Sequence, residues 1–382
     1  MEMFDWKLTI KFNITLMNMA GLWPPGDETY KLNFYSLYAI SLITLLLVCH
    51  VISQTINLFF ILDDLQAITG TVFLLLAEML IVLKACCLIK NMRILKQLMT
   101  TLDSNLFQPK STRQRLLVES SLNFWKRMNK TFWSMGTCTV IFWGIFPILD
   151  NTFKNYRLPF FAWYPYDTKT SPLYEITYIY QVISTSFAAY VNINTDTLIA
   201  ALNMYTGTQI DLLCDNLRNL HYPDEYFNKK LIICVRHHQA ILIFANDSNR
   251  FFNWIIFLQF FVSAISIGIT MFQITVVKLH IILQTMFFCF NGFFQVASYS
   301  NEFYSFMIYF SAAIVEIFIY CWFGNEVEIK SRKISYALFE SDWTTMSPKT
   351  KTTMMFFLLR CHKPLKISAF NLFYLSLDTF VG

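Results

Sequence analysis

Several windows of the chain contain no Asp, Glu, Lys or Arg over about 20 residues, the length that a helix needs to cross a bilayer. Of the 382 residues, 55% are hydrophobic and only 14% are charged, whereas soluble domains contain about 25% charged residues. In lipid, every backbone polar group must be hydrogen-bonded within the protein, and a helix achieves this within one segment. The sequence therefore predicts an all-α, polytopic bundle of transmembrane helices and excludes a soluble globular protein.

The uncharged windows define six predicted spans within one transmembrane domain, residues 1–382. These spans are residues 33–61, 65–89, 131–149, 174–200, 251–277 and 303–325. A further apolar segment, 277–295, lies between the fifth and sixth spans. The predicted cytoplasmic segment 326–366 follows the sixth span, and the apolar part of residues 367–382 is too short to cross a membrane.

Basic residues between the spans predict the orientation in the membrane. Residues 90–130 contain nine Lys or Arg and two acidic residues, and residues 324–366 contain eight Lys or Arg and four acidic residues. Cytoplasmic loops are enriched in Lys and Arg, so we expect both segments in the cytoplasm. Two spans precede the first segment, which places the N-terminus in the cytoplasm as well. An even number of crossings must separate the two segments, so 277–295 is not expected to cross.

Short motifs form an ordered set over nearly the whole chain. They are GLWP at 21–24, LPFFAWYPYD at 158–167, YIYQ at 178–181, NTDTL at 194–198, YCWFGNE at 320–326 and SLDTF at 376–380. In this order they resemble motifs of the insect odorant receptor family. The resemblance implies a tuning subunit rather than the shared coreceptor, and the predicted cytoplasmic N-terminus agrees with the inverted topology of that family.

The resemblance also implies a function. A subunit of this family binds a small volatile odorant and assembles with the coreceptor into a hetero-tetramer, which is an odorant-gated, non-selective cation channel. The expected location is the plasma membrane of olfactory neuron dendrites, with lipid as a further partner. No enzyme activity, catalytic residue, metal, cofactor or nucleic-acid binding is expected. A gustatory-type chemoreceptor shares the architecture and stays an alternative.

A membrane transporter of small apolar molecules is a rival of a different class. It would use paired charges within the membrane, discontinuous helices or a cluster of ligand-binding polar groups. The sequence shows none of these, which favours the receptor interpretation.

Two features depart from the family pattern. The family has no counterpart of the apolar insert 277–295, and the seventh, pore-lining span is missing or truncated in residues 367–382. Val277-Lys278 can be encoded as GTNAAR and Phe294-Gln295 as TTYCAR, which are the two ends of an intron. The insert and the final Val381-Gly382 are therefore either unspliced intron or genuine protein sequence. The same choice leaves open whether this form of the chain reaches the membrane and whether it conducts ions.

The resemblance implies that the ligand site lies in the outer half of the bundle. A site for a small apolar odorant should be an apolar, aromatic-lined cavity with few polar groups. Tyr178, Gln181 and Thr185 share one helix face and are the sharpest candidates. Ordinary helix packing is the alternative for each aromatic residue, because the chain contains 39 Phe. The full predicted set is Phe73, Glu78, Trp143, Phe146, Tyr178, Gln181, Thr185, Tyr304 and Phe306.

Other polar residues receive structural interpretations. Lys84 lies toward the cytoplasmic end of its span, where a long side chain is expected to snorkel to the interface. Asp196 and Glu316 are expected to pack and hydrogen-bond between helices. His237-His238 falls in a predicted cytoplasmic segment and is interpreted as a solvated pair, since no acidic or cysteine ligand pattern accompanies it.

Overall fold

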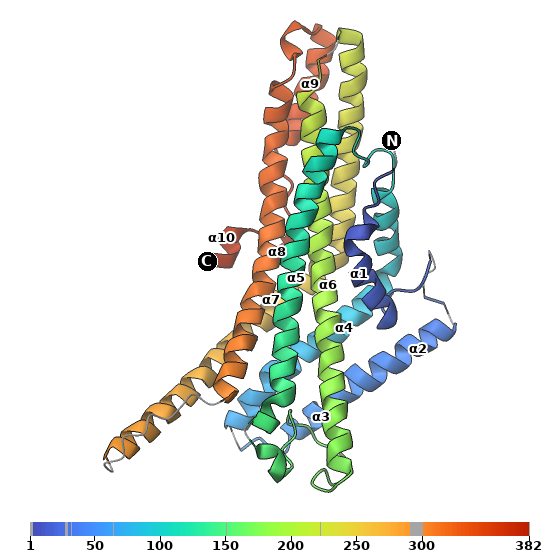
Figure 1. Ribbon diagram of the computed structural model, residues 1–382. Coiled ribbons are helices and arrows are strands. Elements are labelled where there is room, and N and C mark those ends of the chain that lie inside the picture. Colours follow the sequence, from blue (N-terminus) through green and yellow to red (C-terminus); the bar gives the residue numbers. More distant parts are fainter. Residues whose placement is uncertain are drawn as a thin grey trace.

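The computed structural model describes residues 3–26, 30–31, 33–63, 65–149, 151–221, 223–290 and 301–381. Over these residues the chain is a bundle of long helices (Figure 1), so the all-α prediction is confirmed. The helices are α1 Lys7–Met19, α2 Phe34–Ile43, α3 Cys49–Leu58, α4 Leu65–Leu102, α5 Thr112–Leu149, α6 Leu173–Arg218, α7 Asp224–Phe290, α8 Asn301–Phe339, α9 Pro348–Cys361 and α10 Leu377–Val381. A π-helical turn, Thr44–Val48, joins α2 to α3, and the hairpin of β1 (Ser368–Ala369) and β2 (Phe373–Tyr374) precedes α10.

The predicted spans lie inside these helices, most of which are longer than the spans. The first span corresponds to α2, the π turn and α3, and the others are parts of α4, α5, α6, α7 and α8. Four stretches of the described helices are long and apolar enough to cross a membrane: Phe34–Leu58, Ala67–Leu102, Asp224–Val276 and Met307–Phe339. The third and fourth predicted spans, in α5 and α6, fall outside this set. The span limits stay a prediction.

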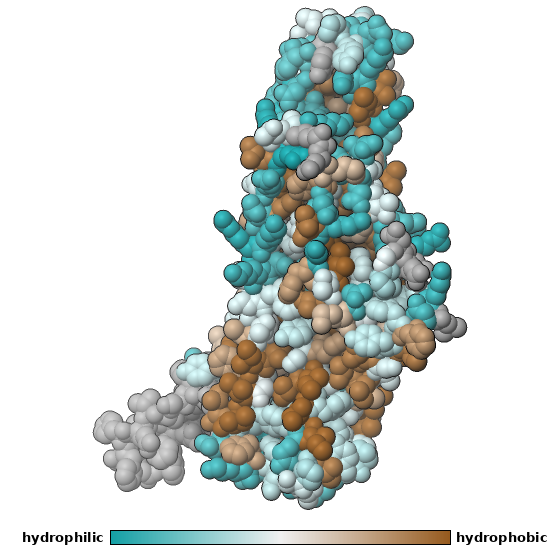
Figure 2. Space-filling model, turned by 45° about the vertical axis from the view of Figure 1, so that its right-hand side comes forward, coloured by the Kyte–Doolittle hydropathy of each residue, from teal (hydrophilic) through white to brown (hydrophobic). Residues whose placement is uncertain are grey.

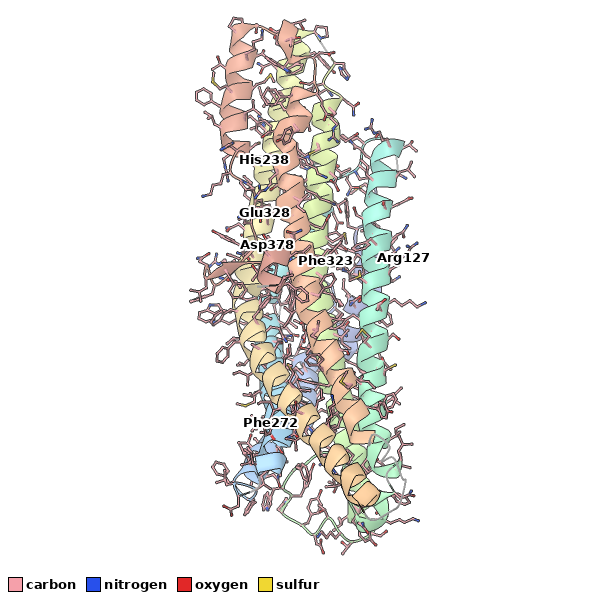
Figure 3. All side chains as sticks on the ribbon, turned by 90° about the vertical axis from the view of Figure 1, so that its left-hand side faces the viewer. Arg127, His238, Phe272, Phe323, Glu328 and Asp378 are labelled. Atoms are coloured by element: carbon pink, nitrogen blue, oxygen red, sulfur yellow. The ribbon has the colours of Figure 1, made fainter. Side chains whose placement is uncertain are left out.

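The long helices continue past the predicted spans toward one end of the molecule. Side chains over that end are mostly hydrophilic, whereas hydrophobic side chains gather over the opposite half (Figure 2). Figure 3 shows the same division along the helices, with His238 and Glu328 in the upper half and Phe272 in the lower half. The bundle therefore has an apolar half suited to lipid and a polar half suited to water.

Helix α6 is the central element of the bundle. It packs against α1, α5, α7 and α8, and almost every residue between Ile193 and Leu217 is buried, including polar ones. A helix that is buried on all sides belongs in the middle of its neighbours. Asp196 and Gln209 therefore meet partners on other helices, whereas Thr195 and Thr206 donate to carbonyls of α6 itself.

The prediction of a solvated His237-His238 pair is wrong. Both side chains are buried, because this segment is part of a packed helix in the polar half and not a loop. His237 Nε2 lies 3.0 Å from Oε1 of Gln209, and the ring of His238 meets Phe357 edge-on with 5.4 Å between centroids. Burial, the largest cause, lowers the pKa of each histidine to about 4.

Two motif glycines are required by close packing. Gly21 has φ +77°, and a Cβ there would lie 2.6 Å from Cα of Ala39. A Cβ on Gly324 would lie 2.7 Å from the backbone oxygen of Leu375. The glycine in YCWFGNE therefore lets the C-terminal segment lie directly against α8, where Phe380 also meets Phe318 edge-on.

The described part of the apolar insert belongs to helix α7 and does not form a separate segment after it. Helix α7 continues without a break through Lys278 to Phe290, and its distal end projects away from the bundle (Figure 1). The last residues of the insert, 291–295, lie outside the described residues. The intron hypothesis stays a prediction.

We expect Gly324→Ala to lower the free energy of unfolding by about 1–3 kcal/mol, because the added methyl overpacks the contact with Leu375. Gly268→Ala is the matched control, since a Cβ at this α7 position meets nothing within 4 Å. Alanine is the better helix former, so the control should be neutral or slightly stabilising. Thermal unfolding of the purified protein in detergent measures both. Equal melting temperatures for the two variants would contradict the packing argument.

The histidine pair predicts a loss of stability in acid. Unfolded histidines titrate near pH 6.5, whereas these two titrate at about 4 in the folded chain. Between these values the unfolded state binds more protons, so stability is complete above pH 6.5 and falls as the pH drops toward 4. His238→Phe keeps an aromatic ring against Phe357 and should reduce the slope of melting temperature against pH in this window. An unchanged slope would exclude His238 as a source of this pH dependence.

Candidate ligand-binding site

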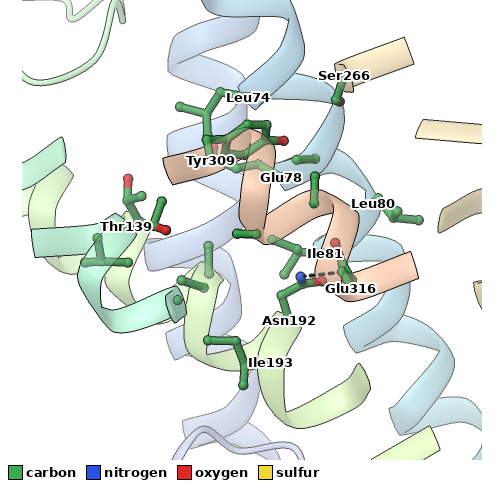
Figure 4. Close-up of a pocket in the computed structure, with 18 of the residues that line it drawn as sticks. Leu74, Glu78, Leu80, Ile81, Thr139, Asn192, Ile193, Ser266, Tyr309 and Glu316 are labelled. Atoms are coloured by element: carbon green, nitrogen blue, oxygen red, sulfur yellow. Dashed lines mark hydrogen bonds between the residues drawn. The ribbon is translucent and has the colours of Figure 1, made fainter. Parts of the chain in front are cut away.

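A cavity of about 140 Å³ lies in the apolar half of the bundle, between α4, α5, α6, α7 and α8 (Figure 4). An engineered apolar cavity of about 150 Å³ binds benzene, so this volume suits a small organic molecule. Most of the lining is apolar, with Leu74, Ile81, Val140 and Ala188 among its members. The polar lining residues are Glu78, Thr139, Thr185, Asn192, Gln259, Ser263, Ser266, Tyr309 and Glu316.

Three of the predicted site residues line this cavity: Glu78, Trp143 and Thr185. Phe73 lies directly behind the lining, where it is completely buried. Its ring centroid is 6.2 Å from that of Trp143 and 4.9 Å from that of Tyr309. Phe73 therefore supports two aromatic walls of the cavity and is not part of its surface.

The side chains of Tyr178 and Gln181 hydrogen-bond to backbone groups and do not line the cavity. The Gln181 side chain accepts from the Phe160 amide and donates to the Phe160 carbonyl, both at 3.1 Å. The Tyr178 hydroxyl donates to the Gly144 carbonyl at 2.5 Å. The loop between α5 and α6 thus binds the Gln181 side chain through Phe160, and the backbone of α5 binds the Tyr178 hydroxyl. Only Thr185, further along the same face, reaches the cavity.

Of the remaining predicted residues, only Tyr304 has a described side chain, and it is not part of the described lining. Tyr304 is exposed and belongs to the first turn of α8. The side chains of Phe146 and Phe306 lie outside the described residues.

Sequence reasoning missed several lining residues. Phe160 is in the LPFFAWYPYD motif, and its ring stacks on Trp143 with 5.7 Å between centroids. Tyr309 is five residues beyond the predicted Tyr304, and the sequence does not say which of the two faces inward. The sequence of α7 could have indicated its lining residues, because they have the spacing i, i+3, i+4 and i+7 of one helix face. They are Gln259, Val262, Ser263 and Ser266.

A buried ion cluster adjoins the cavity and joins α4, α6 and α8. The ammonium of Lys84 lies 2.6 Å from Asp196 Oδ1, 2.6 Å from Asn192 Oδ1 and 3.5 Å from Glu316 Oε1. Asn192 donates to Glu316 at 2.8 Å, and both residues line the cavity (Figure 4). The hydroxyl of Tyr320 donates to Asp196 Oδ1 at 2.5 Å.

The cluster corrects two predictions. Lys84 does not snorkel: its side chain is 0% exposed, because carboxylates on two neighbouring helices pair with it inside the bundle. The expectation that the sequence holds no paired charges within the membrane is therefore also wrong, since Lys84 and Asp196 come from different spans. Asp196 and Glu316 do hydrogen-bond between helices, as expected.

Glu78 has a separate set of partners in the first predicted span. Gln54 Nε2 donates to Glu78 Oε2 at 2.8 Å and lies 2.9 Å from His50 Nε2. His50 Nε2 is 3.5 Å from the other carboxylate oxygen, Oε1. Helix α3 thus supplies one firm donor to Glu78 Oε2, and Oε1 has no hydrogen-bond partner among the described residues.

Comparison with known proteins agrees with this architecture. The family model described as 7tm Odorant receptor matches residues 64–292 and 276–382, two stretches that overlap within the apolar insert. Odorant receptor Or1 of Anopheles gambiae is 24% identical, over 99% of this chain and 92% of the relative. Odorant receptor 46a, isoform A, of Drosophila melanogaster is 21% identical, over 93% and 88%.

Solved structures share the fold. The olfactory receptor OR5 of Machilis hrabei superposes with a TM-score of 0.83 at 18% identity, covering 99% of this chain and 96% of that one. The structure of the same receptor in complex with eugenol has a TM-score of 0.81 at 17% identity. The family match covers well over half of the sequence, so the chain is a membrane receptor and not an enzyme, and it belongs to the 7tm odorant receptor family.

Proposed function

We propose that the chain is an odorant receptor subunit that binds a small volatile ligand in the cavity between α4 and α8. The observation that carries this is the cavity itself, which is mostly apolar and has Trp143, Phe160 and Tyr309 in its walls. Such a cavity, with a few polar groups, is the usual form of a small-molecule site. The structural relative bound to eugenol supports the same use of the fold.

We further propose that the subunit assembles with a shared coreceptor into an odorant-gated, non-selective cation channel in the plasma membrane of olfactory neuron dendrites. Membership of the family supports this step. The ligand would act by binding more tightly when the channel is open than when it is closed, because only a difference in affinity shifts the equilibrium. The ligand-binding residues in this proposal are Glu78, Trp143, Phe160, Thr185 and Tyr309.

Two alternative functions, a gustatory-type chemoreceptor and a transporter, have less support. A gustatory-type chemoreceptor shares the architecture, but the matching family model and the curated relatives above are odorant receptors. Lys84 and Asp196 are paired, so an absence of paired charges does not speak against a transporter. The match to the odorant receptor family favours a receptor instead.

A cavity-filling substitution tests the proposed site. Ala312 lines the cavity, so Ala312→Phe should occupy the ligand volume and reduce odorant sensitivity by about tenfold or more, the effect of 1.4 kcal/mol or more of steric cost. The measurement is the calcium signal of cells that express the chain with a coreceptor and receive a panel of volatiles.

Ala264→Phe is the matched control, because Ala264 is exposed on α7 and does not line the cavity. It should keep the sensitivity of the unmodified chain. The proposal fails if Ala312→Phe responds normally to every ligand that activates the unmodified receptor. Substrate flux without the coreceptor would favour the transporter instead.

The cytoplasmic N-terminus and the outer position of the loop before α6 are part of the same proposal. The double substitution Asp167→Asn and Lys169→Thr creates a glycosylation site in this exposed loop, and we expect it to be glycosylated. His221→Thr creates the matched site at Asn219, between α6 and α7, and we expect no glycan there. A change in mass that glycosidase removes is the readout, and the opposite pattern would reverse the proposed topology.

A further inference from the structure

The polar atoms that line the cavity include acceptors without donors. Glu78 and Gln259 are 2% and 5% exposed, and both line the cavity. Glu78 Oε1 and Gln259 Oε1 are buried and have no hydrogen-bond partner among the residues that the structure describes. His50 Nε2 is 3.5 Å from Glu78 Oε1, but it also faces the Gln54 amide donor at 2.9 Å, so it acts there as an acceptor. A carboxylate oxygen can only accept, so Glu78 Oε1 needs a donor from elsewhere.

Four donor groups of the lining are engaged with protein acceptors. Asn192 Nδ2 donates to Glu316, and Gln259 Nε2 donates to Ser263 at 2.8 Å. The hydroxyl of Thr139 donates to a backbone carbonyl of its own helix at 2.9 Å, and that of Ser266 donates to the Phe73 carbonyl at 3.3 Å. These four groups could donate to an acceptor on a ligand only by giving up those bonds.

The charged residues in the lining also favour a ligand that donates a hydrogen bond. Glu78 and Glu316 both line it, and the described lining residues include no Lys or Arg. The nearest cation, Lys84, lies behind the lining with Asp196 and Asn192 each at 2.6 Å. The cavity therefore presents acidic side chains and open acceptors to whatever occupies it.

We propose that the cavity selects compact apolar ligands that carry a hydrogen-bond donor, such as an alcohol or a phenol, over ketones, esters and ethers of the same size, with Glu78 Oε1 as the acceptor. This inference rests on the proposed function of the cavity as the ligand site. A ligand hydroxyl gives the buried carboxylate the partner that it lacks. A ligand without a donor leaves Glu78 Oε1 without a hydrogen-bond partner. An unsatisfied buried charged group costs free energy and weakens binding of such a ligand.

The test compares three six-membered rings on the purified, unmodified chain in detergent. Cyclohexanol carries a donor and an acceptor, cyclohexanone carries an acceptor only, and methylcyclohexane carries neither. Calorimetric titration gives each dissociation constant, and ligand-induced thermal stabilisation gives an independent measure. We expect cyclohexanol to bind at least about tenfold more tightly than cyclohexanone, in line with a hydrogen bond to a charged group.

Variants of Glu78 assign the preference to one side chain. Glu78→Met keeps the length of the side chain but has no strong acceptor, so the cyclohexanol-to-cyclohexanone ratio should fall to near one. Glu78→Gln retains the pairing with Gln54 and offers both an acceptor and a donor, so the ratio should fall here too while the fold is preserved. Glu119→Gln is the matched control, because Glu119 is exposed on α5 far along the helix from the cavity. It should keep the full ratio.

The outcomes separate this inference from the proposed function. Equal binding of cyclohexanol and cyclohexanone to the unmodified chain, or a preference for the ketone, would overturn donor selection while leaving the cavity as the ligand site. An unchanged ratio in both Glu78 variants would overturn the assignment to Glu78. Failure of all three rings to bind, or binding that Ala312→Phe leaves unaffected, would overturn the proposed ligand site together with the inference.

Discussion

The pairing of the Lys84 ammonium with Asp196 inside the bundle is the interaction on which the arrangement around the cavity depends. A charge away from water is strongly unfavourable unless it is paired and hydrogen-bonded, and removing one partner leaves the other uncompensated. Because the partners of Lys84 come from α6 and α8, these two helices and α4 are held together at one depth. Asn192 and Glu316 belong both to this cluster and to the cavity lining, so the cluster forms one wall of the site.

The opposite wall depends on the loop between α5 and α6. Gln181 holds the backbone of Phe160 by two hydrogen bonds, and Phe160 in turn stacks on Trp143. A loop would ordinarily be the least ordered part of a binding site, but here its backbone is paired with a buried side chain. The cavity is therefore bounded by a charged cluster on one side and by a hydrogen-bonded aromatic cover on the other. Both boundaries involve α6, the most buried helix of the bundle.

Part of the candidate site could be predicted from the sequence. Glu78, Trp143 and Thr185 are predictable because a polar or aromatic side chain in the middle or outer half of a predicted span is a reasonable ligand contact. Gln181 shares a helix face with Thr185, yet its side chain is hydrogen-bonded to the backbone of Phe160 in the loop. The α7 face with Gln259 and Ser266 showed the spacing of an inward surface, but its direction depends on how the whole helix is rotated. Phe160 could not be placed, since nothing in the local sequence says where a loop will lie.

The sequence by itself determined the all-α membrane architecture, because the length and apolar character of a span are local properties of consecutive residues. Its motifs also indicated the family, which the family match confirms. The tertiary structure alone decided which polar side chains meet. Successive residues on a helix point about 100° apart, so a small rotation changes whether Lys84 reaches lipid headgroups or the carboxylate of Asp196. Helix rotation is set by packing against all neighbours at once, and the pairing of Lys84, the burial of His237 and the open acceptor of Glu78 all follow from it.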